Sequence, residues 1–289
     1  MYFGLSEEQQ FFQESIDKFL EDTVTVDALR SYRTGGDNNL VDEVFNGLNE
    51  LGLSGLIIPE EYGGLGLDSL FAVSVSESLG KGVAPYPFTG SFLIAPFLIN
   101  KLGSDSQKQK YLPSIAIGEY RFAVALTEMT GRRIEKGIQN SNQKLSGQSL
   151  FVMDDINSTH YLILDSDGAL HIIEAEESGL EKVELTTVDI TSFMSELLLD
   201  EVKAETLGSG LGNIEALKQA INLGRVAIAA ETLGASQSML NRSVDYAKER
   251  KQFGRPIGSF QAVKHMCAQM ASDLEPCYCL LYTSDAADE

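Results

Sequence analysis

The spacing of apolar residues changes twice along the chain, and this change restricts the fold more than any other feature. Over the first 120 residues apolar side chains recur at helical spacing, and then short β-rich runs such as HYLIL and SELLL replace that pattern. Helical spacing returns over residues 213–249 without a proline. We therefore expect an α+β fold with an N-terminal helical domain (1–120), a middle antiparallel β-sheet domain (121–210) and a C-terminal helical bundle (211–289).

Local signals place the elements within this division. Ser6 followed by Gln9 predicts a capping box at the start of the first helix. The turn from Asp165 to Gly168 lies between two apolar runs and predicts a β-hairpin, because Asp-Gly tolerates the positive φ of tight turns. Further helices are expected at residues 41–51, 69–80, 91–102, 105–111, 213–249 and 260–281. The β-branched content of Phe71 to Ser76 would suit a strand as well as the helix expected there.

Charge and cysteine content exclude several classes of function. The 22 Lys and Arg residues against 42 Asp and Glu give a net charge of -20, which repels nucleic acid and anionic membranes. No apolar run approaches the roughly 18 residues that span a bilayer, and the start of the chain lacks a signal-peptide pattern, so we expect a cytoplasmic protein. Cys267, Cys277 and Cys279 lack a complementary His or Cys cluster and are expected to be free thiols without a metal.

The stretch YAKERKQFGRPIGSFQAVKH at residues 246–265 gathers cations in this acidic chain. Arg250 and Lys251 lie in the last turn of the predicted helix, where the helix dipole favours cations, so an ordinary helix terminus is one interpretation. However, Phe253 and Phe260 flank the Gly-Arg-Pro-Ile-Gly turn, and a guanidinium can bind a pair of phosphate oxygens. This turn is therefore also a candidate pyrophosphate site beside an aromatic ring.

The same stretch, with others along the chain, resembles the acyl-CoA dehydrogenase family. The resemblance covers nearly all 289 residues and rests on LGLSGLIIPEEYGGLGLDS, VSESLGKG, ALTE, LSGQSLFV and LGRVAIAAETLGASQSMLNRSVDYAKERKQFGRPIGSFQAVKH. It implies a flavoprotein that uses FAD to form the α,β double bond of an acyl-CoA thioester. It also implies an electron transfer flavoprotein as electron acceptor and a homo- or hetero-oligomer with another subunit of the family.

The resemblance assigns candidate site residues. The family's RxxFG arginine corresponds to Arg250, which with Gln252 and Phe253 is expected to reach the FAD of a neighbouring subunit. Phe260 and Gln261 match the pair that contacts the same dinucleotide. Two other candidates are Thr127, in the flavin-binding loop, and Arg225, in a region that contacts the CoA portion of the substrate. A salt bridge within the helix is the alternative for Arg225, and Glu60 and Glu61 are interpreted as solvated loop carboxylates without a catalytic role.

The sequence departs from the family pattern at the flavin loop and beside it. Where active members carry a TEPxxGSD-like loop, residues 126–133 read LTEMTGRR, so two arginines replace the Ser-Asp pair. Met153 stands where the family often has a threonine, and thioether sulfur cannot donate a hydrogen bond. Phe151 can still supply an apolar plane. These changes leave open whether this subunit binds its own FAD.

No residue in the chain is expected to be the catalytic base. Most members carry this glutamate in later helices, beyond the end of this sequence, and some carry it just before the arginine matched by Arg225, where this chain has Gly224. The sequence after Pro276 also reads like translated sequencing adapter rather than family sequence. We therefore expect an incomplete chain that is inactive by itself.

Three functions are compatible with these residues. The first is an FAD-dependent acyl-CoA dehydrogenase. The alternative is a non-catalytic structural subunit of a heteromeric acyl-CoA dehydrogenase that completes its partner's FAD site, which the altered TEMTGRR loop and Met153 favour. A more distant possibility keeps the fold but changes the chemistry, as in flavin monooxygenases or nitroalkane oxidases of the same superfamily.

Overall fold

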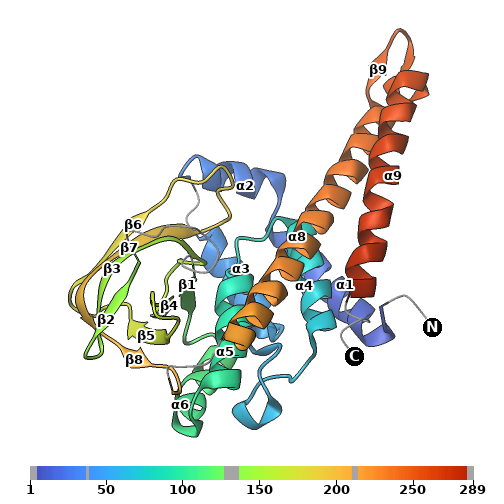
Figure 1. Cartoon of the computed structure of the whole chain (residues 1–289). Coiled ribbons are helices and arrows are strands. Elements are labelled where there is room, and N and C mark those ends of the chain that lie inside the picture. The colour runs from blue at the N-terminus through green and yellow to red at the C-terminus, as the bar shows by residue number, and fades with distance from the viewer. Residues whose placement is uncertain (1–4, 37–38, 127–136, 210–213, 285–289) are drawn as a thin grey trace. The chain divides into compact units, whose positions relative to one another are not determined.

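The computed structural model describes residues 5–36, 39–126, 137–209 and 214–284 (Figure 1). The chain divides into two compact units. The first unit takes its described residues from 1–29, 69–84 and 226–289, and the second from 30–68 and 85–225. The long helix α8, Ile214–Glu249, begins in the second unit and continues in the first.

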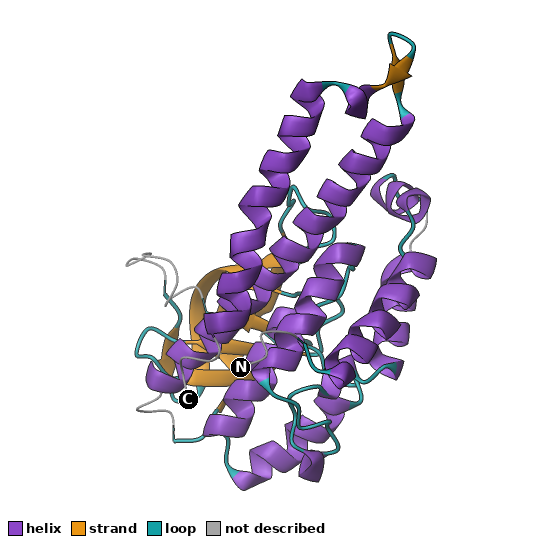
Figure 2. Cartoon of the chain, turned by 90° about the vertical axis from the view of Figure 1, so that its right-hand side faces the viewer, coloured by secondary structure: helices purple, strands orange, loops and turns teal. Residues whose placement is uncertain are grey.

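Helices build the first unit. They are α1 (Glu7–Thr23), α4 (Ser69–Gly82), the later part of α8, and α9 (Gln261–Ser284). The predicted capping box is present, because the Ser6 hydroxyl accepts a hydrogen bond from the Gln9 amide at 3.2 Å and the Gln9 side chain accepts one from the Ser6 amide at 2.8 Å. Figure 2 shows α8 and α9 side by side, joined at one end by a short strand pair.

Two glycines allow α4 and α8 to approach closely. A Cβ atom at Gly80 would lie 1.9 Å from the carbonyl oxygen of Glu231, and one at Gly234 would lie 1.9 Å from the carbonyl oxygen of Glu77. Around this crossing, Val73, Ala230 and Leu233 form a buried cluster against which α9 also packs. The stretch Phe71 to Ser76 is helical, as predicted, because this face of α4 packs on neighbouring helices.

The second unit begins with helical segments. They are the end of α2 (Val26–Arg33), α3 (Leu40–Glu50), η1 (Leu53–Gly55), η2 (Glu60–Tyr62), η3 (Phe88–Ile94), α5 (Ala95–Leu102) and α6 (Asp105–Ala116). The helix expected at residues 91–102 starts earlier than predicted, because η3 is a π-helix that runs directly into α5. All seven residues of η3 are buried, and π-helical turns of this kind are rare.

A strongly curved sheet (Figure 1) follows in the second unit, before the first part of α8. Its described strands are β1 (Phe122–Ala125), β2 (Gln139–Ser141), β3 (Lys144–Met153), β4 (His160–Leu164), β5 (Leu170–Glu174), β6 (Leu180–Glu184), β7 (Met194–Lys203) and β8 (Glu205–Thr206). The strand order is β6-β7-β3-β1-β4-β5-β8, with β2 paired to β3. The sheet is antiparallel as expected except that β1 and β4 are parallel, with Phe122 opposite His160.

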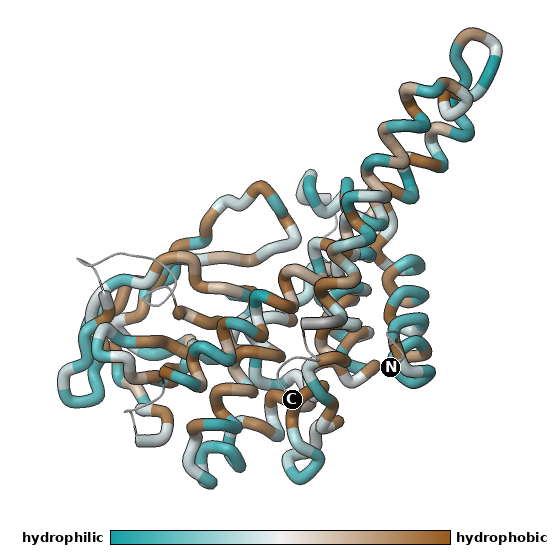
Figure 3. Tube along the Cα trace, turned by 45° about the vertical axis from the view of Figure 1, so that its right-hand side comes forward, coloured by the Kyte–Doolittle hydropathy of each residue, from teal (hydrophilic) through white to brown (hydrophobic). Residues whose placement is uncertain are grey.

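The predicted hairpin between β4 and β5 is present. Gly168 has a φ of 85°, and one Asp165 carboxylate oxygen accepts hydrogen bonds from the amides of Asp167 (3.0 Å) and Ala169 (2.8 Å). The other oxygen lies 2.8 Å from Nε2 of the buried His171. The apolar core of the sheet draws on β1, β3, β4, β5 and β7, and hydrophobic stretches run along its central strands in Figure 3.

The chain therefore has helices at its N-terminal end, a β-sheet in the middle and helices at its C-terminal end, as the sequence predicts. The domain limits at residues 120 and 210 stay a prediction. None of the described helices has an apolar stretch long enough to cross a membrane.

Candidate functional site

The turn between α8 and α9 is a miniature β-hairpin. After α8 ends, β9 (Lys251–Gln252) pairs with β10 (Arg255–Pro256), and the amide of Ile257 donates a 2.7 Å hydrogen bond to the carbonyl of Arg250. The two residues at its tip have positive φ, 53° at Phe253 and 77° at Gly254. Such values suit a two-residue hairpin turn, but they are unusual for phenylalanine. The turn thus holds Phe253 in a strained backbone conformation.

This conformation presents an aromatic ring to solvent. Phe253 is 91% exposed, and its ring meets the ring of Phe260 edge-on with centroids 6.1 Å apart. The guanidinium carbon of Arg255 lies 4.2 Å from the centroid of the Phe260 ring, a cation-π contact. The tip therefore combines two rings and a cation in one small surface, and of these three side chains only Arg255 is not among the cofactor contacts expected from the sequence.

Three cations at this tip lack counter-charges. Arg250, Lys251 and Arg255 are exposed, and none of them forms an ion pair with a residue that the structure describes. The nearest ion pair along the chain joins Lys248 to Asp245 at 3.2 Å, one turn earlier in α8. Unpaired cations are conspicuous in a chain of net charge -20, because its many carboxylates could have paired with them. The tip is electrostatically suited to an anion such as a pyrophosphate.

The structure brings together five of the seven predicted site residues. Arg250, Gln252, Phe253, Phe260 and Gln261 all belong to this turn or to the first residue of α9. Arg225 lies about seven helical turns earlier in α8, where its Nη1 donates a 3.2 Å hydrogen bond to Asn222. Thr127, with most of the altered loop at 126–133, falls outside the described residues.

By the sequence resemblance, Gly224 stands at the position where some members of the family are expected to carry the catalytic carboxylate. It is buried within α8, and a Cβ atom there would lie 2.8 Å from the terminal methyl group of Ile94 and 3.5 Å from the methyl group of Thr89. Both neighbours belong to η3. A carboxylate side chain at this position would have to displace them, so the local packing is adapted to glycine.

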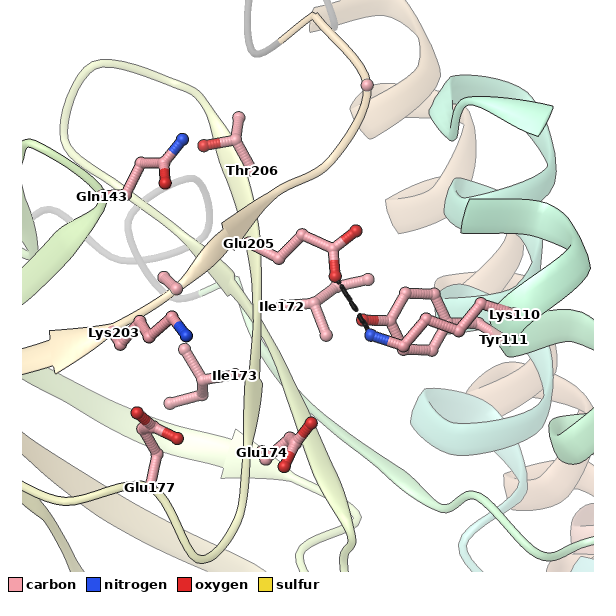
Figure 4. Close-up of a pocket in the computed structure, with 12 residues that line it drawn as sticks. Lys110, Tyr111, Gln143, Ile172, Ile173, Glu174, Glu177, Lys203, Glu205 and Thr206 are labelled. Carbon is pink, nitrogen blue, oxygen red and sulfur yellow. Dashed lines mark hydrogen bonds and ion pairs between the residues drawn. The ribbon is translucent and has the colours of Figure 1, made fainter. Parts of the chain in front are cut away.

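A hollow lies beside the sheet, between β5, β8 and α6 (Figure 4). It is a pocket of about 560 Å³ with charged walls. Its lining residues are Lys110, Tyr111, Gln143, Ile172, Ile173, Glu174, Glu177, Lys203, Ala204, Glu205, Thr206 and Gly208. None of the residues predicted from the sequence lines it.

Glu205 is the most firmly held charge in this pocket. It accepts hydrogen bonds from the Tyr111 hydroxyl (2.7 Å) and the Gln107 amide (2.8 Å), and it forms a 3.2 Å ion pair with Lys110. Burial alone would raise the pKa of Glu205, but these three partners outweigh it and lower the pKa. Burial raises the pKa of Tyr111 to about 12. Near neutral pH Glu205 is therefore ionised and Tyr111 keeps its proton, so the hydrogen bond between them is retained. This indicates a structural role.

Sequence reasoning missed this network because its members are far apart in the chain. One signal was available, since Ser104 and Gln107 form a second capping box, at the start of α6. The Gln107 side chain also donates to the carbonyl of Thr206 at 2.9 Å and accepts from the amide of Gly208 at 2.9 Å. No sequence pattern predicts these two long-range hydrogen bonds.

Comparison with known proteins identifies the family. The description "Acyl-CoA dehydrogenase, N-terminal domain" matches residues 6–119, and "Acyl-CoA dehydrogenase, C-terminal domain" matches residues 212–287. A 3-(aryl)acrylate reductase of Clostridium sporogenes is 31% identical over 84% of this chain and 70% of its own length. The chain belongs to the acyl-CoA dehydrogenase family.

Other members of the family are similarly related. A protein of Bacillus subtilis named probable acyl-CoA dehydrogenase YngJ is 29% identical over 95% of this chain and 77% of its own length. The solved structure of a glutaryl-coenzyme A dehydrogenase in complex with glutaryl-CoA matches the whole of this chain over 78% of its own length, at a TM-score of 0.85 and 27% identity. The fold of these acyl-CoA dehydrogenases is the fold described above.

Members of the acyl-CoA dehydrogenase family are FAD-dependent flavoproteins. The described residues of the α8–α9 turn fit part of such a cofactor. Unpaired guanidinium and ammonium groups suit the pyrophosphate, and the exposed ring of Phe253 offers a face to an aromatic base.

Proposed function

We propose that this chain is a subunit of an acyl-CoA dehydrogenase that forms the α,β double bond of an acyl-CoA thioester. The observation that carries the proposal is the exposed turn with three unpaired cations around Phe253. FAD, when bound, supplies the acceptor for the hydride that leaves the β carbon. The family is an oxidoreductase family, and the finer assignment of substrate and cofactor contacts is our proposal.

In this proposal the turn serves a neighbouring subunit. Arg250 and Gln252 donate hydrogen bonds to the dinucleotide, while Phe253 and Phe260 cover its aromatic part and Gln261 contacts it from the start of α9. Exposure of Arg250, Gln252, Phe253 and Gln261 supports a contact made outside the chain, and the β9–β10 pairing fixes the backbone of the turn that presents them. The protein would thus act as a homo- or hetero-oligomer of acyl-CoA dehydrogenase subunits.

Two further residues complete the assignment. We place Thr127 beside the flavin and Arg225 beside the CoA portion of the substrate, both by their match to the family pattern. Arg225 is exposed, and its solvent-exposed hydrogen bond to Asn222 can be exchanged for a charge-assisted one to a phosphate. An electron transfer flavoprotein is the proposed electron acceptor, and one relative is named as a subunit of a caffeyl-CoA reductase-Etf complex of Acetobacterium woodii.

A second candidate is a structural subunit that completes a partner's FAD site without catalysing the reaction. Gly224 favours it, because the packing of Ile94 and Thr89 leaves no room for a carboxylate there. Met153 favours it too, since a thioether cannot replace a hydroxyl donor. A structural neighbour titled "Tcur3481-Tcur3483 steroid ACAD G363A variant" carries two protein names and is 29% identical, with a TM-score of 0.83.

The test is to purify the protein alone and together with any paralogue encoded beside it, and to measure bound flavin. Bleaching of that flavin by acyl-CoA thioesters of different length would then report dehydrogenation. Bleaching by the single protein would reject the structural-subunit alternative. Bleaching only by the mixed complex would favour that alternative.

The cofactor contact is tested by Arg250→Ala in the assembled protein. Loss of a charge-assisted hydrogen bond of about 1.5–3 kcal/mol should weaken flavin binding roughly 10- to 100-fold. Arg242→Ala is the matched control, because Arg242 is an exposed arginine two turns earlier on the same helix. Equal flavin occupancy in both variants would show that the turn does not hold the cofactor.

A further inference from the structure

A cluster of aromatic rings in the second unit leaves one buried hydroxyl without a partner. Tyr86 is 7% exposed, and its hydroxyl makes no hydrogen bond to any residue that the structure describes. Its ring stacks on Phe92 with centroids 5.3 Å apart and also contacts Phe45 and Phe88. An unsatisfied buried hydroxyl is costly, so its retention here calls for a partner.

An arginine lies against the same cluster. The guanidinium carbon of Arg121 is 3.4 Å from the centroid of the Phe45 ring. Arg121 immediately precedes β1, and its backbone is held by Thr159, whose hydroxyl accepts from the Arg121 amide at 3.0 Å. Its half-buried side chain forms no ion pair within the described chain.

The side chains that carry the guanidinium and the hydroxyl lie against one ring, that of Phe45, with the Tyr86 and Phe45 ring centroids 5.7 Å apart. Burial lowers the pKa of Arg121, whereas the exposed carboxylate of Asp42 and the Tyr86 hydroxyl each act to raise it. Burial raises the pKa of Tyr86 above its ordinary range, and Arg121 acts in the opposite direction. Tyr86 therefore keeps its proton, and the side chains of a cation and of a hydroxyl donor both contact the ring of Phe45.

We propose that Arg121 and Tyr86 together bind a small carboxylate. A guanidinium donates two parallel N–H groups that match the two oxygens of a carboxylate, and the tyrosine hydroxyl supplies a further donor. A doubly charged phosphate fits less well, because the surrounding rings would strip more hydration than one guanidinium could replace. The carboxylate is either a free small acid or the acidic end of a larger molecule.

The first test compares unfolding in acetate with unfolding in chloride at equal ionic strength. A ligand at ten times its Kd should lower the unfolding equilibrium constant about 11-fold, because this constant changes by the factor one plus the ratio of ligand to Kd. Wild-type protein should therefore be stabilised by acetate in a saturable way. Equal stability in the two salts over the whole titration would refute the proposal.

Two variants then assign the effect to the proposed residues. Tyr86→Phe removes only the hydroxyl, so it should leave stability in chloride unchanged or higher while weakening the acetate effect at least threefold. A loss of stability in chloride would show that the hydroxyl already has a permanent partner, such as a buried water, and would overturn the site. Arg121→Met should abolish the acetate effect, whereas the exposed Arg33→Met should retain it.

Calorimetry distinguishes the two sources of the carboxylate. Wild-type and Tyr86→Phe proteins are titrated with free glutarate and, separately, with glutaryl-CoA and butyryl-CoA. A Tyr86-dependent difference with free glutarate identifies a free acid, and one confined to glutaryl-CoA over butyryl-CoA identifies the end of an acyl chain. Absence of a Tyr86-dependent difference with all three probes would contradict the proposal. This result does not depend on the proposed function, because binding is measured without turnover.

Discussion

The glycine crossing between α4 and α8 makes a quantitative prediction about stability. In Gly234→Ala the new methyl group would start 1.9 Å from the carbonyl oxygen of Glu77, 2.8 Å from its carbonyl carbon and 2.9 Å from the amide nitrogen of Lys81. These are backbone atoms of α4, so the clash can be relieved only by separating the two helices. Separation would open the buried cluster around Leu233.

The expected magnitude follows from two opposing effects. Overpacking against backbone lies at the upper end of its usual cost, about 3 kcal/mol, whereas replacing glycine by alanine within a helix gains about 1 kcal/mol. We therefore expect Gly234→Ala to lower the free energy of unfolding by about 2 kcal/mol. Gly224→Ala in the same helix is the matched control, because its methyl group would meet the movable end of the Ile94 side chain at 2.8 Å. That variant should stay within about 1 kcal/mol of wild type.

Urea denaturation followed by far-ultraviolet circular dichroism measures both variants. A fall in the midpoint with an unchanged slope would report lost stability without a change in the unfolded state. The reasoning would be refuted if Gly234→Ala unfolded at the wild-type midpoint. It would also be refuted if Gly224→Ala were equally destabilised, since the backbone contact would then not be decisive.

Further predictions concern polar contacts in the second unit. Burial raises the pKa of Asp154 from its ordinary value near 3.8 to about 6, against the opposing hydrogen bonds from the amides of Gly90 and Ser91. The folded state therefore holds this proton more tightly than the unfolded state. The free energy of unfolding should fall as pH rises from about 4 to 6, by at most about 3 kcal/mol. Denaturation midpoints measured across that range should lose this part of the pH dependence in Asp154→Asn. Gln107→Ala should lose roughly 1–3 kcal/mol in urea denaturation, because it leaves Thr206 and Gly208 without their hydrogen-bond partner; an unchanged midpoint would contradict this role. Gly168→Ala should be destabilised by about 1 kcal/mol although nothing lies within 4 Å of its Cβ position, because its φ of 85° is strained for alanine; thermal unfolding should show a lower midpoint.

Much of the fold follows from signals confined to a few neighbouring residues. The capping box at Ser6 and the Asp165–Gly168 hairpin depend on hydrogen bonds within three or four residues, so their sequence patterns predict them correctly. The uninterrupted helix α8 follows from its apolar spacing, and the chain stays helical through both Gly224 and Gly234. Neighbouring elements pack closely against both glycines, which explains why glycine occurs within this helix despite its low helix propensity.

Features that depend on distant residues could not be predicted in this way. In the sheet β1 lies between β3 and β4 and pairs with β4 in parallel, and no local sequence pattern encodes this arrangement. The π-helix η3, which precedes α5, is buried at every residue, and no local sequence pattern distinguishes it from an α-helix. Likewise, the ring of Phe45 comes from α3, far from the arginine that lies over it.

The candidate site shows the same division. The five residues of the α8–α9 turn are close in sequence and are brought together, whereas their proposed contact with the FAD of another subunit stays a prediction. The cation-π contact of Arg255 depends on the exact path of the turn. The sequence shows the charge of Arg255 but not the ring that it covers.

The side chain of Gln107 links the start of α6 to the end of β8 by hydrogen bonds. It caps the first turn of α6 and also fastens the end of β8, where the chain leaves the sheet. A chimera that imported α6 from a relative with a different capping residue would also loosen that exit, even with every strand retained. Exchange of segments between relatives should therefore move residues 104–111 and 205–208 as a pair.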